Sequence, residues 1–341
     1  MNIATIFSPF QAVSSLVKFE FGALIMVILI GGSGYMGSAF AAELHKRQIP
    51  HQIVSRCTTD YTNFESLCRL LEKAKPSFLI NAAGAVGKPN VDACELARSE
   101  AVLGNVVLPQ LISNACDISG VPWAQVSSGC IYSGAKILSD GKVRIEKDLT
   151  LPHVRQIVDD SPSSVLGYSE DDSPNFSFRE SPCSFYSGTK ALGEEVISKA
   201  KQTYIWRLRI PFDEYDNDRN YLTKLQRYDR VYDNVNSISH RQDFVRACLD
   251  LWESGANFGT YNVTNPGFVT SRQVVEMIQR NFKVRRAFKF WKDDEEFYRL
   301  AASAPRSNCV LDTTKLLAAG VKMRPVVEAL EESLMRWSSA V

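Results

Sequence analysis

Short apolar runs alternate with helical patterns along the first two-thirds of the chain. Continuous runs rich in β-branched residues are typical of buried strands, and apolar residues three and four apart indicate covering helices. The predicted strands span residues 25–30, 51–55, 77–81, 122–127 and 204–210. The predicted helices begin near Ser38 and then span residues 63–73, 91–116 and 186–201.

This alternation predicts an α/β fold. Strands that follow one another through helices form a parallel sheet with right-handed crossovers. We expect a Rossmann-type doubly wound parallel sheet in a dinucleotide-binding domain over residues 26–210, with a smaller C-terminal substrate lobe. That lobe spans residues 211–341 and is interleaved with the sheet.

Two segments depart from the pattern. Residues 133–182 are rich in Ser, Asp, Gly and Pro, and predict a long irregular insertion over the active site, a candidate lid. Residues 1–25 precede the first strand, and Met26 could itself start the fold. We expect residues 1–25 to be a disordered extension, because a cleaved signal peptide would remove part of the first strand.

A glycine-rich turn directly follows the first strand. Gly31, Gly34 and Gly37 stand three apart, between a strand and a helix. Such glycines allow a tight turn, a close approach of backbone to a pyrophosphate, and close helix–strand packing. The turn therefore predicts dinucleotide binding at the N-terminus of the helix. The predicted cofactor contacts are Gly31, Gly34, Tyr35, Met36, Gly37, Ser55, Arg56, Asn81, Ala82, Ala83, Gly84, Asn105, Tyr186 and Lys190.

The end of the second strand bears on the choice of cofactor. A carboxylate there would bond the ribose 2′-hydroxyl, but Ser55 and Arg56 occupy this place and the first acidic residue is Asp60. Arg56 could pair with a 2′-phosphate, which favours NADP(H) over NAD(H). The alternative is that Arg56 is a solvated surface residue.

Tyr186 and Lys190 stand four apart at the start of a predicted helix, and so share one face. A tyrosine hydroxyl can protonate the alkoxide left by hydride delivery to a carbonyl. A nearby ammonium lowers the tyrosine pKa and can bond the nicotinamide ribose. Ser128 would polarise the same carbonyl. Tyr132 and Lys136 form a competing copy, but it lies between a strand and a turn, and Tyr132 is expected to line the substrate pocket.

Composition excludes several classes. The 341 residues carry a net charge of +1, which gives no support for binding nucleic acid or a membrane surface. Eight scattered cysteines without a Cys-x-x-Cys pair, and no credible secretory signal, suggest reduced thiols and a cytoplasmic protein. The four histidines form no pair at ligand spacing, so no metal site is predicted, and His240 is expected to be structural or to face the nucleotide.

Nine sequence blocks together resemble one branch of the extended short-chain dehydrogenase/reductases. The branch comprises the nucleotide-sugar 3,5-epimerase/4-reductases of UDP-rhamnose synthesis, and dTDP-4-dehydrorhamnose reductases are related to it. The blocks begin at residues 81, 87, 129, 170, 184, 207, 219, 262 and 304. The resemblance implies NAD(P)H-dependent epimerisation at C3 and C5, and reduction at C4, of a 4-keto-6-deoxy nucleotide sugar.

The resemblance assigns an epimerising pair to Cys130 and Lys224. The ketone acidifies the protons at C3 and C5, so a thiolate could remove one and a second group could return it to the opposite face. Such a thiolate needs a positive neighbour or the cofactor charge near neutral pH. The structural alternative is that Cys130 is a small buried core residue.

The substrate contacts implied by the resemblance and by phosphate chemistry are Val86, Asn90, Tyr132, Arg209, Asn220 and Arg306. Asn105 resembles an asparagine that steadies the site. Two alternatives remain: an NAD-dependent 4-epimerase or dehydratase, and a non-catalytic dinucleotide-binding regulatory subunit. By analogy the chain could form a homodimer.

Overall fold

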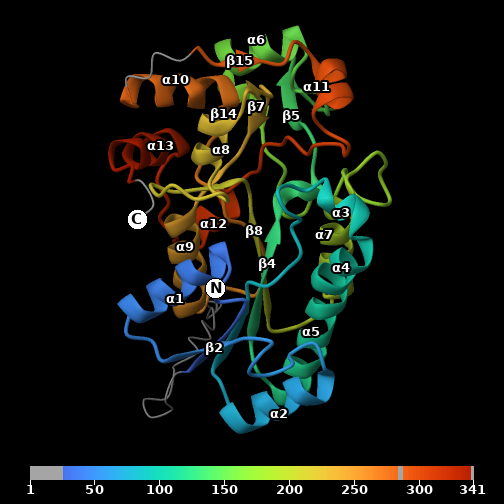
Figure 1. Ribbon diagram of the computed structural model, residues 1–341, viewed down its shortest axis with the longest axis vertical. Coiled ribbons are helices and arrows are strands. Elements are labelled where there is room, and N and C mark those ends of the chain that lie inside the picture. The colour runs from blue at the N-terminus through green and yellow to red at the C-terminus, as the bar shows by residue number, and fades with distance from the viewer. Residues whose placement is uncertain (1–25, 283–286, 339–341) are drawn as a thin grey trace, which may run out of the picture.

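The computed structural model describes residues 26–282 and 287–338, so the predicted extension 1–25 lies outside the described residues. A parallel sheet of six strands runs through the molecule (Figure 1) in the order β13-β8-β4-β3-β1-β2. Its strands are β1 (Val27–Ile30), β2 (His51–Val54), β3 (Phe78–Asn81), β4 (Trp123–Ser128), β8 (Thr203–Leu208) and β13 (Gly259–Asn262).

Helices cover both faces of this sheet, because successive strand residues point to opposite sides. Val27 and Leu29 pack with α1 (Tyr35–Lys46) and α9 (Arg241–Glu253), whereas Ile28 and Ile30 pack with the second helix layer. That second layer consists of α2 (Phe64–Ala74), α5 (Leu108–Ser119) and α7 (Phe185–Val196). The predicted doubly wound architecture is confirmed.

The strand order sets the position of the site. The chain first adds β2 on one side of β1 and then β3 on the other. Ligands of open α/β sheets bind where the order reverses, outside the carboxyl ends of the strands. For this sheet, the rule predicts a binding position at the turns that follow β1 and β3.

The C-terminal half also supplies a group of short helices and strands that lie outside the central sheet. Its apolar core joins Phe212, Leu222, Val274 and Leu330, from four different segments. The helices are α8 (Tyr221–Arg227), α10 (Ser271–Phe282), α11 (Asp294–Leu300), α12 (Thr314–Ala318) and α13 (Val326–Met335). The short strands form the pairs β9 (Pro211–Phe212) with β12 (Ser239–His240), β10 (Arg230–Val231) with β15 (Lys289–Phe290), and β11 (Val235–Asn236) with β14 (Val269–Thr270).

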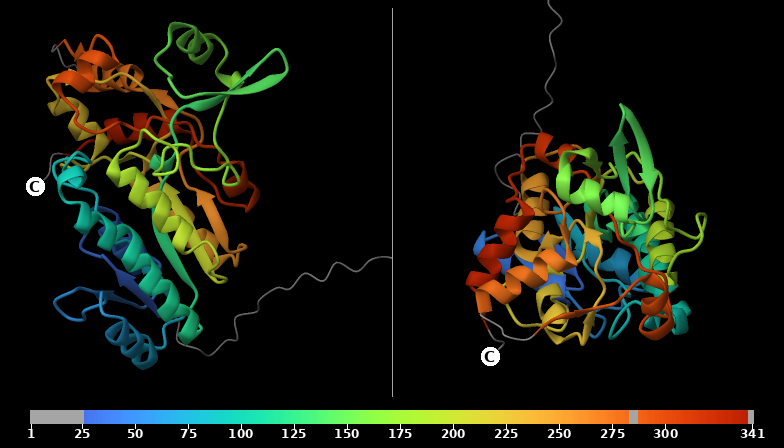
Figure 2. Two further views of the ribbon diagram at one scale, coloured as in Figure 1. Left: turned by 90° about the vertical axis from the view of Figure 1, so that its right-hand side faces the viewer. Right: turned by 90° about the horizontal axis from the view of Figure 1, so that it is seen from above.

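The prediction that residues 133–182 are irregular is wrong for residues 135–166. The segment forms a three-stranded sheet of β5 (Ala135–Ser139), β6 (Lys142–Glu146) and β7 (Val165–Leu166), with α6 (Pro152–Asp160) beside it. Figure 2 shows the β5–β6 hairpin projecting from the body. Ile137, Val154 and Val158 have a core of their own, which packs on Val235 and Val310. The few apolar residues of the segment are enough to form a core because they pack together with residues of the C-terminal half.

The long helix predicted over residues 91–116 is interrupted. It comprises α3 (Ala93–Leu96), α4 (Arg98–Val102), a π-helical turn (Leu103–Val107) and α5. Within the described residues, 98–119 is the one helical stretch long and apolar enough to cross a membrane, but half of it is buried in the protein. Packing against the sheet accounts for its apolar face.

Other boundaries follow the predictions closely. The five predicted strands are present, each with its ends within two residues of those expected where described. The first helix begins at Tyr35, three residues earlier than expected, because Gly34 serves as its N-cap. The helix predicted over residues 186–201 ends at Val196.

Candidate active site

The glycine turn brings three backbone segments together at the switch point. Gly31 has φ +79°, and a Cβ at this position would lie 2.5 Å from the amide nitrogen of Ala83. A Cβ at Gly37 would overlap the carbonyl oxygen of Gly31. Only glycine therefore allows β1, α1 and the turn after β3 to approach so closely.

The first turn of α1 suits a pyrophosphate. The first amides of a helix lack intrahelical acceptors, and the cap residue Gly34 has no side chain to satisfy them. These amides and the partial positive charge of the helix end fit a dinucleotide. Arg241 supports the turn from α9: its Nε donates to the Tyr35 carbonyl at 2.7 Å and its Nη2 to the Ser38 hydroxyl at 2.7 Å.

Asn81 and Asn105 shape the opposite wall. Asn81 is fully buried, and its Oδ1 accepts a hydrogen bond from the amide of Ala83. Asn105 lies in the π-helical turn, where Nδ2 donates to the Ala85 carbonyl at 2.8 Å and Oδ1 accepts from the Ala85 amide at 3.0 Å. Two bonds to one peptide position fix the loop that follows Gly84. Asn105 therefore contributes to the site by holding this loop in place.

Ser128, Tyr186 and Lys190 converge at the carboxyl end of β4. Ser128 is the last residue of the strand, and its hydroxyl interacts with that of Tyr186 in the first turn of α7. Lys190 Nζ donates to the Val126 carbonyl at 3.2 Å. The competing copy is excluded by its geometry, because Lys136 lies in β5 and pairs with Asp172 at 2.6 Å.

Burial favours the neutral forms of Tyr186 and Lys190. Desolvation raises the pKa of Tyr186, with Cys130 adding to the effect, although Ser128 and Arg209 oppose it. Desolvation lowers the pKa of Lys190. Tyr186 therefore holds its proton, as a general acid must.

Cys130 lies beside this cluster in a 3₁₀ turn, and it is 6% exposed. Its amide donates to Ser128 Oγ at 3.2 Å. Burial raises the pKa of the thiol, and Ser128, Arg209 and Lys190 only partly offset that effect. The environment thus favours the thiol over the thiolate that a base would require.

Lys224 lies in α8, half-buried next to Arg219. Burial and the charge of Arg219 lower the pKa of Lys224, which favours the free amine. Arg219 donates to the Gly87 carbonyl at 3.1 Å, so α8 faces the loop after β3. Neither cation forms an ion pair with another described residue.

Arg219 is a further candidate functional residue, which is absent from the predicted contacts. Its signal was present in the block that starts at residue 219 and ends at Lys224. Arg219 borders the predicted sugar site and forms no ion pair with a described carboxylate. It is therefore a better candidate for a diphosphate contact than a cation that is already paired.

Several predicted substrate residues have other roles. Asn220 is fully buried, caps α8 and donates to Asp213 and Tyr215, so its side chain has no capacity left for phosphate. Arg306 forms a bidentate pair with Asp92 at 2.6 and 2.7 Å. Both assignments are therefore corrected.

Tyr132 and Arg209 are also internal. Tyr132 is 0% exposed and stacks on Tyr168 at 4.7 Å between ring centroids, so it does not line an open pocket as predicted. Arg209 is buried, donates to Asn236 Oδ1 at 2.5 Å and to the Ser307 carbonyl, and leaves Nε without a partner among the described residues. Its charge acts on Cys130 and Tyr186, whereas it was predicted to bind the diphosphate.

The outer positions remain open to solvent. Arg56 is exposed just beyond β2, where it forms no ion pair with a described residue, and Ser55 is half-buried. Val86 and Asn90 are exposed on the loop after β3. These placements are compatible with contacts to bound ligands.

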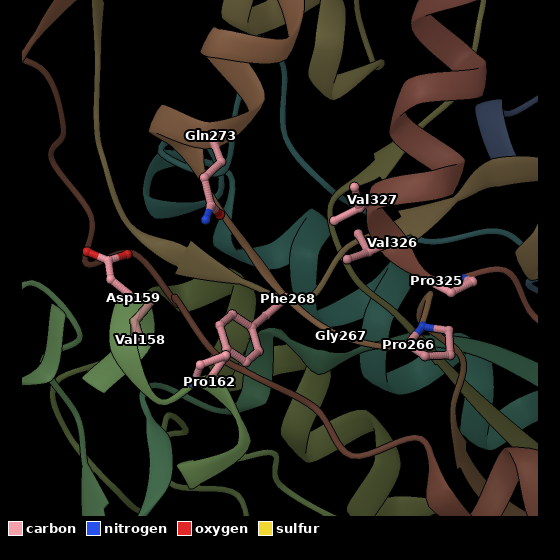
Figure 3. Close-up of a pocket in the computed structure, with 10 residues that line it drawn as sticks. All are labelled: Val158, Asp159, Pro162, Pro266, Gly267, Phe268, Gln273, Pro325, Val326 and Val327. Carbon is pink, nitrogen blue, oxygen red and sulfur yellow. The ribbon is translucent and has the colours of Figure 1, made fainter. Parts of the chain in front are cut away.

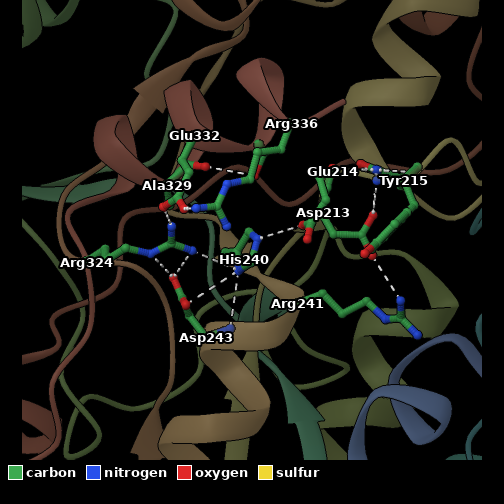
Figure 4. A network of polar contacts seen from close by, with 12 residues as sticks. Asp213, Glu214, Tyr215, His240, Arg241, Asp243, Arg324, Ala329, Glu332 and Arg336 are labelled. Carbon is green, nitrogen blue, oxygen red and sulfur yellow. Dashed lines mark hydrogen bonds and ion pairs between the residues drawn. The ribbon is translucent and has the colours of Figure 1, made fainter. Parts of the chain in front are cut away.

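His240 belongs to a polar network that joins α9 to the C-terminal half (Figure 4). Its Nε2 lies 3.4 Å from Glu214, and Arg324 contacts both His240 and Asp243. Contacts of His240 and Arg324 thus link these four groups into one network, which supports a structural role for His240. Over the described residues, no cluster of three or more His, Cys, Asp or Glu side chains could hold a metal ion.

One apolar hollow of about 380 Å³ lies elsewhere, between α6 and α13 (Figure 3). Val158, Phe268 and Val326 line it, together with neighbouring residues. No residue of the catalytic cluster contributes, so it is separate from that cluster.

Comparisons with known proteins agree on one family. Residues 25–339 match the family described as RmlD substrate binding domain. An Arabidopsis thaliana protein, bifunctional dTDP-4-dehydrorhamnose 3,5-epimerase/dTDP-4-dehydrorhamnose reductase, is 29% identical over 89% of this chain and 90% of its own length. A trifunctional UDP-glucose 4,6-dehydratase/3,5-epimerase/reductase of the same organism is 28% identical over 91% of this chain but 41% of its own length.

Solved structures share the fold. The L780 UDP-rhamnose synthase of Acanthamoeba polyphaga mimivirus superposes with a TM-score of 0.76 at 21% identity, over 92% of this chain and all of its own. A Bacillus anthracis dTDP-4-dehydrorhamnose reductase in complex with NADP gives 0.70 at 19% identity, over 92% and 99%. MoeE5 in complex with UDP-glucuronic acid and NAD gives 0.65 at 16% identity, over 92% and 98%.

Proposed function

Because the chain belongs to the RmlD substrate-binding domain family, we propose that it is an NAD(P)H-dependent oxidoreductase and epimerase of nucleotide sugars. Its substrate is a 4-keto-6-deoxy sugar linked to UDP or dTDP, which is epimerised at C3 and C5 and reduced at C4. The observation that carries this proposal is the convergence of Ser128, Tyr186, Lys190 and Cys130 beside a glycine turn. The names of the relatives support the same chemistry.

The reduction step uses Ser128, Tyr186 and Lys190. The bound nicotinamide dinucleotide would supply the hydride. Ser128 orients the C4 oxygen by a hydrogen bond, and Tyr186 gives that oxygen its proton. The Lys190 ammonium stabilises the tyrosinate that remains.

The epimerisation step assigns opposite roles to Lys224 and Cys130. The lowered pKa of Lys224 suits a base that removes a proton next to the ketone, and the raised pKa of Cys130 suits a thiol that donates one. Arg219 would hold the diphosphate and keep the neighbouring amine neutral. This direction of transfer is the reverse of one that starts from a thiolate.

The exposed Arg56 supports NADP(H) as the preferred cofactor, since its guanidinium would face a 2′-phosphate. The solved relatives include complexes with both NADP and NAD. We therefore propose the preference for NADP(H) from Arg56 alone.

Deuterium exchange tests the proposal. The protein is incubated with UDP- or dTDP-4-keto-6-deoxyglucose and NADPH in deuterated water, and NADPH absorbance and deuterium at C3 and C5 are followed. We expect NADPH oxidation with deuterium at both carbons. Oxidation without exchange would leave a plain reductase, and a lack of both would reject the proposed substrates.

Two variants test the direction of proton transfer. Lys224→Met should abolish exchange, because the base is lost. Cys130→Ser should retain exchange but yield no inverted sugar, since the amine can return a deuteron to the same face. The reverse pattern would make Cys130 the base, and a doubly inverted product from Cys130→Ser would remove it from epimerisation.

The alternatives are less well supported. A dehydratase would require an acidic residue beside the catalytic serine, where this chain has Gly129 and Cys130. A regulatory subunit would have no need of a complete Ser–Tyr–Lys set.

A further inference from the structure

A buried ion pair lies one helical turn beyond Lys190. Glu194 and Arg207 are 8% and 5% exposed. Arg207 Nη2 donates to Glu194 Oε2 at 2.7 Å, and Nε donates to the same oxygen at 3.0 Å. The Ser127 hydroxyl donates to Glu194 Oε1 at 2.5 Å. Removing two charges from water is costly, so net stability alone does not explain a pair buried here.

The carboxylate shares a helix face with the reductase residues. Tyr186, Lys190 and Glu194 follow one another at intervals of four in α7, which aligns them. Lys190 and Glu194 contact adjacent positions of β4, the carbonyl of Val126 and the hydroxyl of Ser127. Glu194 thereby fixes how α7 lies along the strand that ends in the catalytic serine.

Arg207 anchors the other end of the pair. It extends from β8, and its Nη1 donates to the Tyr132 hydroxyl at 3.1 Å. That hydroxyl donates to the Asp172 carbonyl at 2.6 Å. The network thus spans α7, β4, β8 and the segment after β4. Each of its side chains is hydrogen-bonded to a residue of a different element.

Few charges face Lys190. Glu194, on its own helix, and Cys130, in the turn after β4, are the charged or titratable groups that act on it most. From the other elements packed against α7, Glu95 of α3 accepts a hydrogen bond from the amide of Phe185, and Arg98 of α4 lies over the Phe185 ring, both at the far N-terminal end. Asn105 of the π-helical turn is uncharged. Among the described residues, Glu194 is therefore the one carboxylate that acts markedly on the Lys190 ammonium.

We propose that Glu194 and Arg207 are a positioning pair, which holds Tyr186 and Lys190 against Ser128 and keeps the Lys190 ammonium charged. Burial favours the neutral amine, and the carboxylate one turn away opposes it. Arg207 holds this carboxylate in place through two donated hydrogen bonds. The inference rests on the proposed reductase chemistry for its kinetic readout.

The test compares four proteins: the unaltered chain, Glu194→Gln, Arg207→Met, and the double variant. The alkaline limb of kcat for NADPH oxidation marks the loss of a proton from the coupled Tyr186–Lys190 pair, and the charge on Lys190 sets where it falls. We expect this limb at the highest pH in the unaltered chain and in Arg207→Met. It should fall at a lower pH in the double variant and at the lowest pH in Glu194→Gln. Glu194→Gln leaves an unpaired guanidinium near Lys190, so its kcat should also fall by about 10- to 100-fold, as misplacement of a catalytic group does.

The double variant guards against a loss of folding. Replacing a whole buried pair with neutral groups is often tolerated, whereas removing one partner strands a charge. A purely structural role predicts lower kcat at every pH with the limb unmoved in all variants. That result, or a limb raised in Glu194→Gln, would overturn the proposal.

NADPH affinity provides a readout that needs no sugar, because the Lys190 ammonium would also bond the nicotinamide ribose of the bound cofactor. Fluorescence titration across pH should give the same order of the four proteins. If no sugar is turned over but this order holds, the proposed substrate fails and the positioning pair stands. If sugar is turned over and neither series shows the order, the pair has no such role.

Discussion

Tyr186 and Lys190 occupy the same buried helix face, and burial shifts the pKa of each toward its neutral form. A neutral phenol beside Ser128 can donate a proton but cannot be replaced by its phenylalanine analogue. Tyr186→Phe should therefore lower kcat for NADPH oxidation by about 10²- to 10⁴-fold, the usual range for a lost general acid. Steady-state absorbance measurements check this, and unchanged activity would remove Tyr186 from the mechanism.

Tyr132→Phe is the matched control at the residue scale. It alters the competing tyrosine, whose hydroxyl joins Arg207 to the Asp172 carbonyl. We expect a stability loss of ~1 kcal/mol for a buried hydrogen bond, with the chemical step far less affected than in Tyr186→Phe.

Arg56 allows a second residue-scale prediction. Its exposed guanidinium would pair with a 2′-phosphate, and NADH has none. Arg56→Gln should raise KM for NADPH by about tenfold and leave KM for NADH nearly unchanged, since one charge-assisted contact contributes about 1.5 kcal/mol or more. Arg69→Gln on α2 is a suitable control, and equal effects on both cofactors would reject the assignment.

Site residues differ in how far the sequence could define them. Tyr186 and Lys190 carry their spacing in the chain, so their common face was predictable. Asn220 and Arg306 have the right chemical types for phosphate, but their partners Asp213 and Asp92 come from other segments. Which cation has no carboxylate partner is decided by tertiary contacts. The block that begins at Arg219 marks this residue, but only the folded chain shows that its guanidinium forms no ion pair with a described carboxylate.

At the scale of elements, the glycine turn depends on backbone separation. A Cβ at Gly37 would overlap the Gly31 carbonyl, whereas one at Gly34 would lie 3.2 Å from the same atom. Gly37→Ala should therefore separate α1 from β1 and weaken NADPH binding by at least about tenfold, with a lower Tm. Gly34→Ala should keep a Tm close to that of the unaltered chain, so weaker NADPH binding by this variant would reflect crowding of the pyrophosphate and not a displaced helix. Fluorescence titration and thermal unfolding distinguish the two, and an equal Tm for both variants would argue against this geometry.

Elements with local signals were predictable and the insertion was not. Buried parallel strands are continuous apolar runs, so β1, β3 and β4 could be located from the sequence within one or two residues where described. The strand β6 is largely exposed, β5 is only partly buried, and both mix apolar with charged residues. Their pairing is stabilised by β7 and by a core shared with Val235 and Val310, which are distant in sequence.

At the scale of the whole molecule, the two halves are joined by buried charges. Arg241 connects the first turn of α1 to Asp213, and Arg324 connects Asp243 of α9 to the segment that precedes α13. Sequence patterns gave the parallel sheet and the C-terminal lobe, but they could not indicate these links. A single histidine or arginine leaves no periodic pattern in the sequence. The joint between the two halves can therefore be seen only in the folded protein.

Asp243 lets the joint be tested through acid stability. Burial acts to raise its pKa, but His240, Arg324 and Asn265 outweigh burial and hold the pKa well below its usual range. A depressed folded-state pKa gives stability that is present above the unfolded pKa and is lost as pH falls toward the folded one. The unfolding free energy should therefore decline as the pH falls below about 4.

Asp243→Asn should lower the unfolding free energy near neutral pH by about 1.5–3 kcal/mol, because it weakens the charged hydrogen bonds of Asp243 while Arg324 keeps its pair with Glu332. The variant should also lose much of the acid dependence, since the titrating group is gone. Urea unfolding at a series of pH values measures both effects. Asp218→Asn, at an exposed carboxylate paired with Arg227, should change stability by less than about 1 kcal/mol and keep the acid dependence. A variant at residue 243 that follows the unaltered chain at every pH would show that the halves are held together by apolar packing and not by this charge.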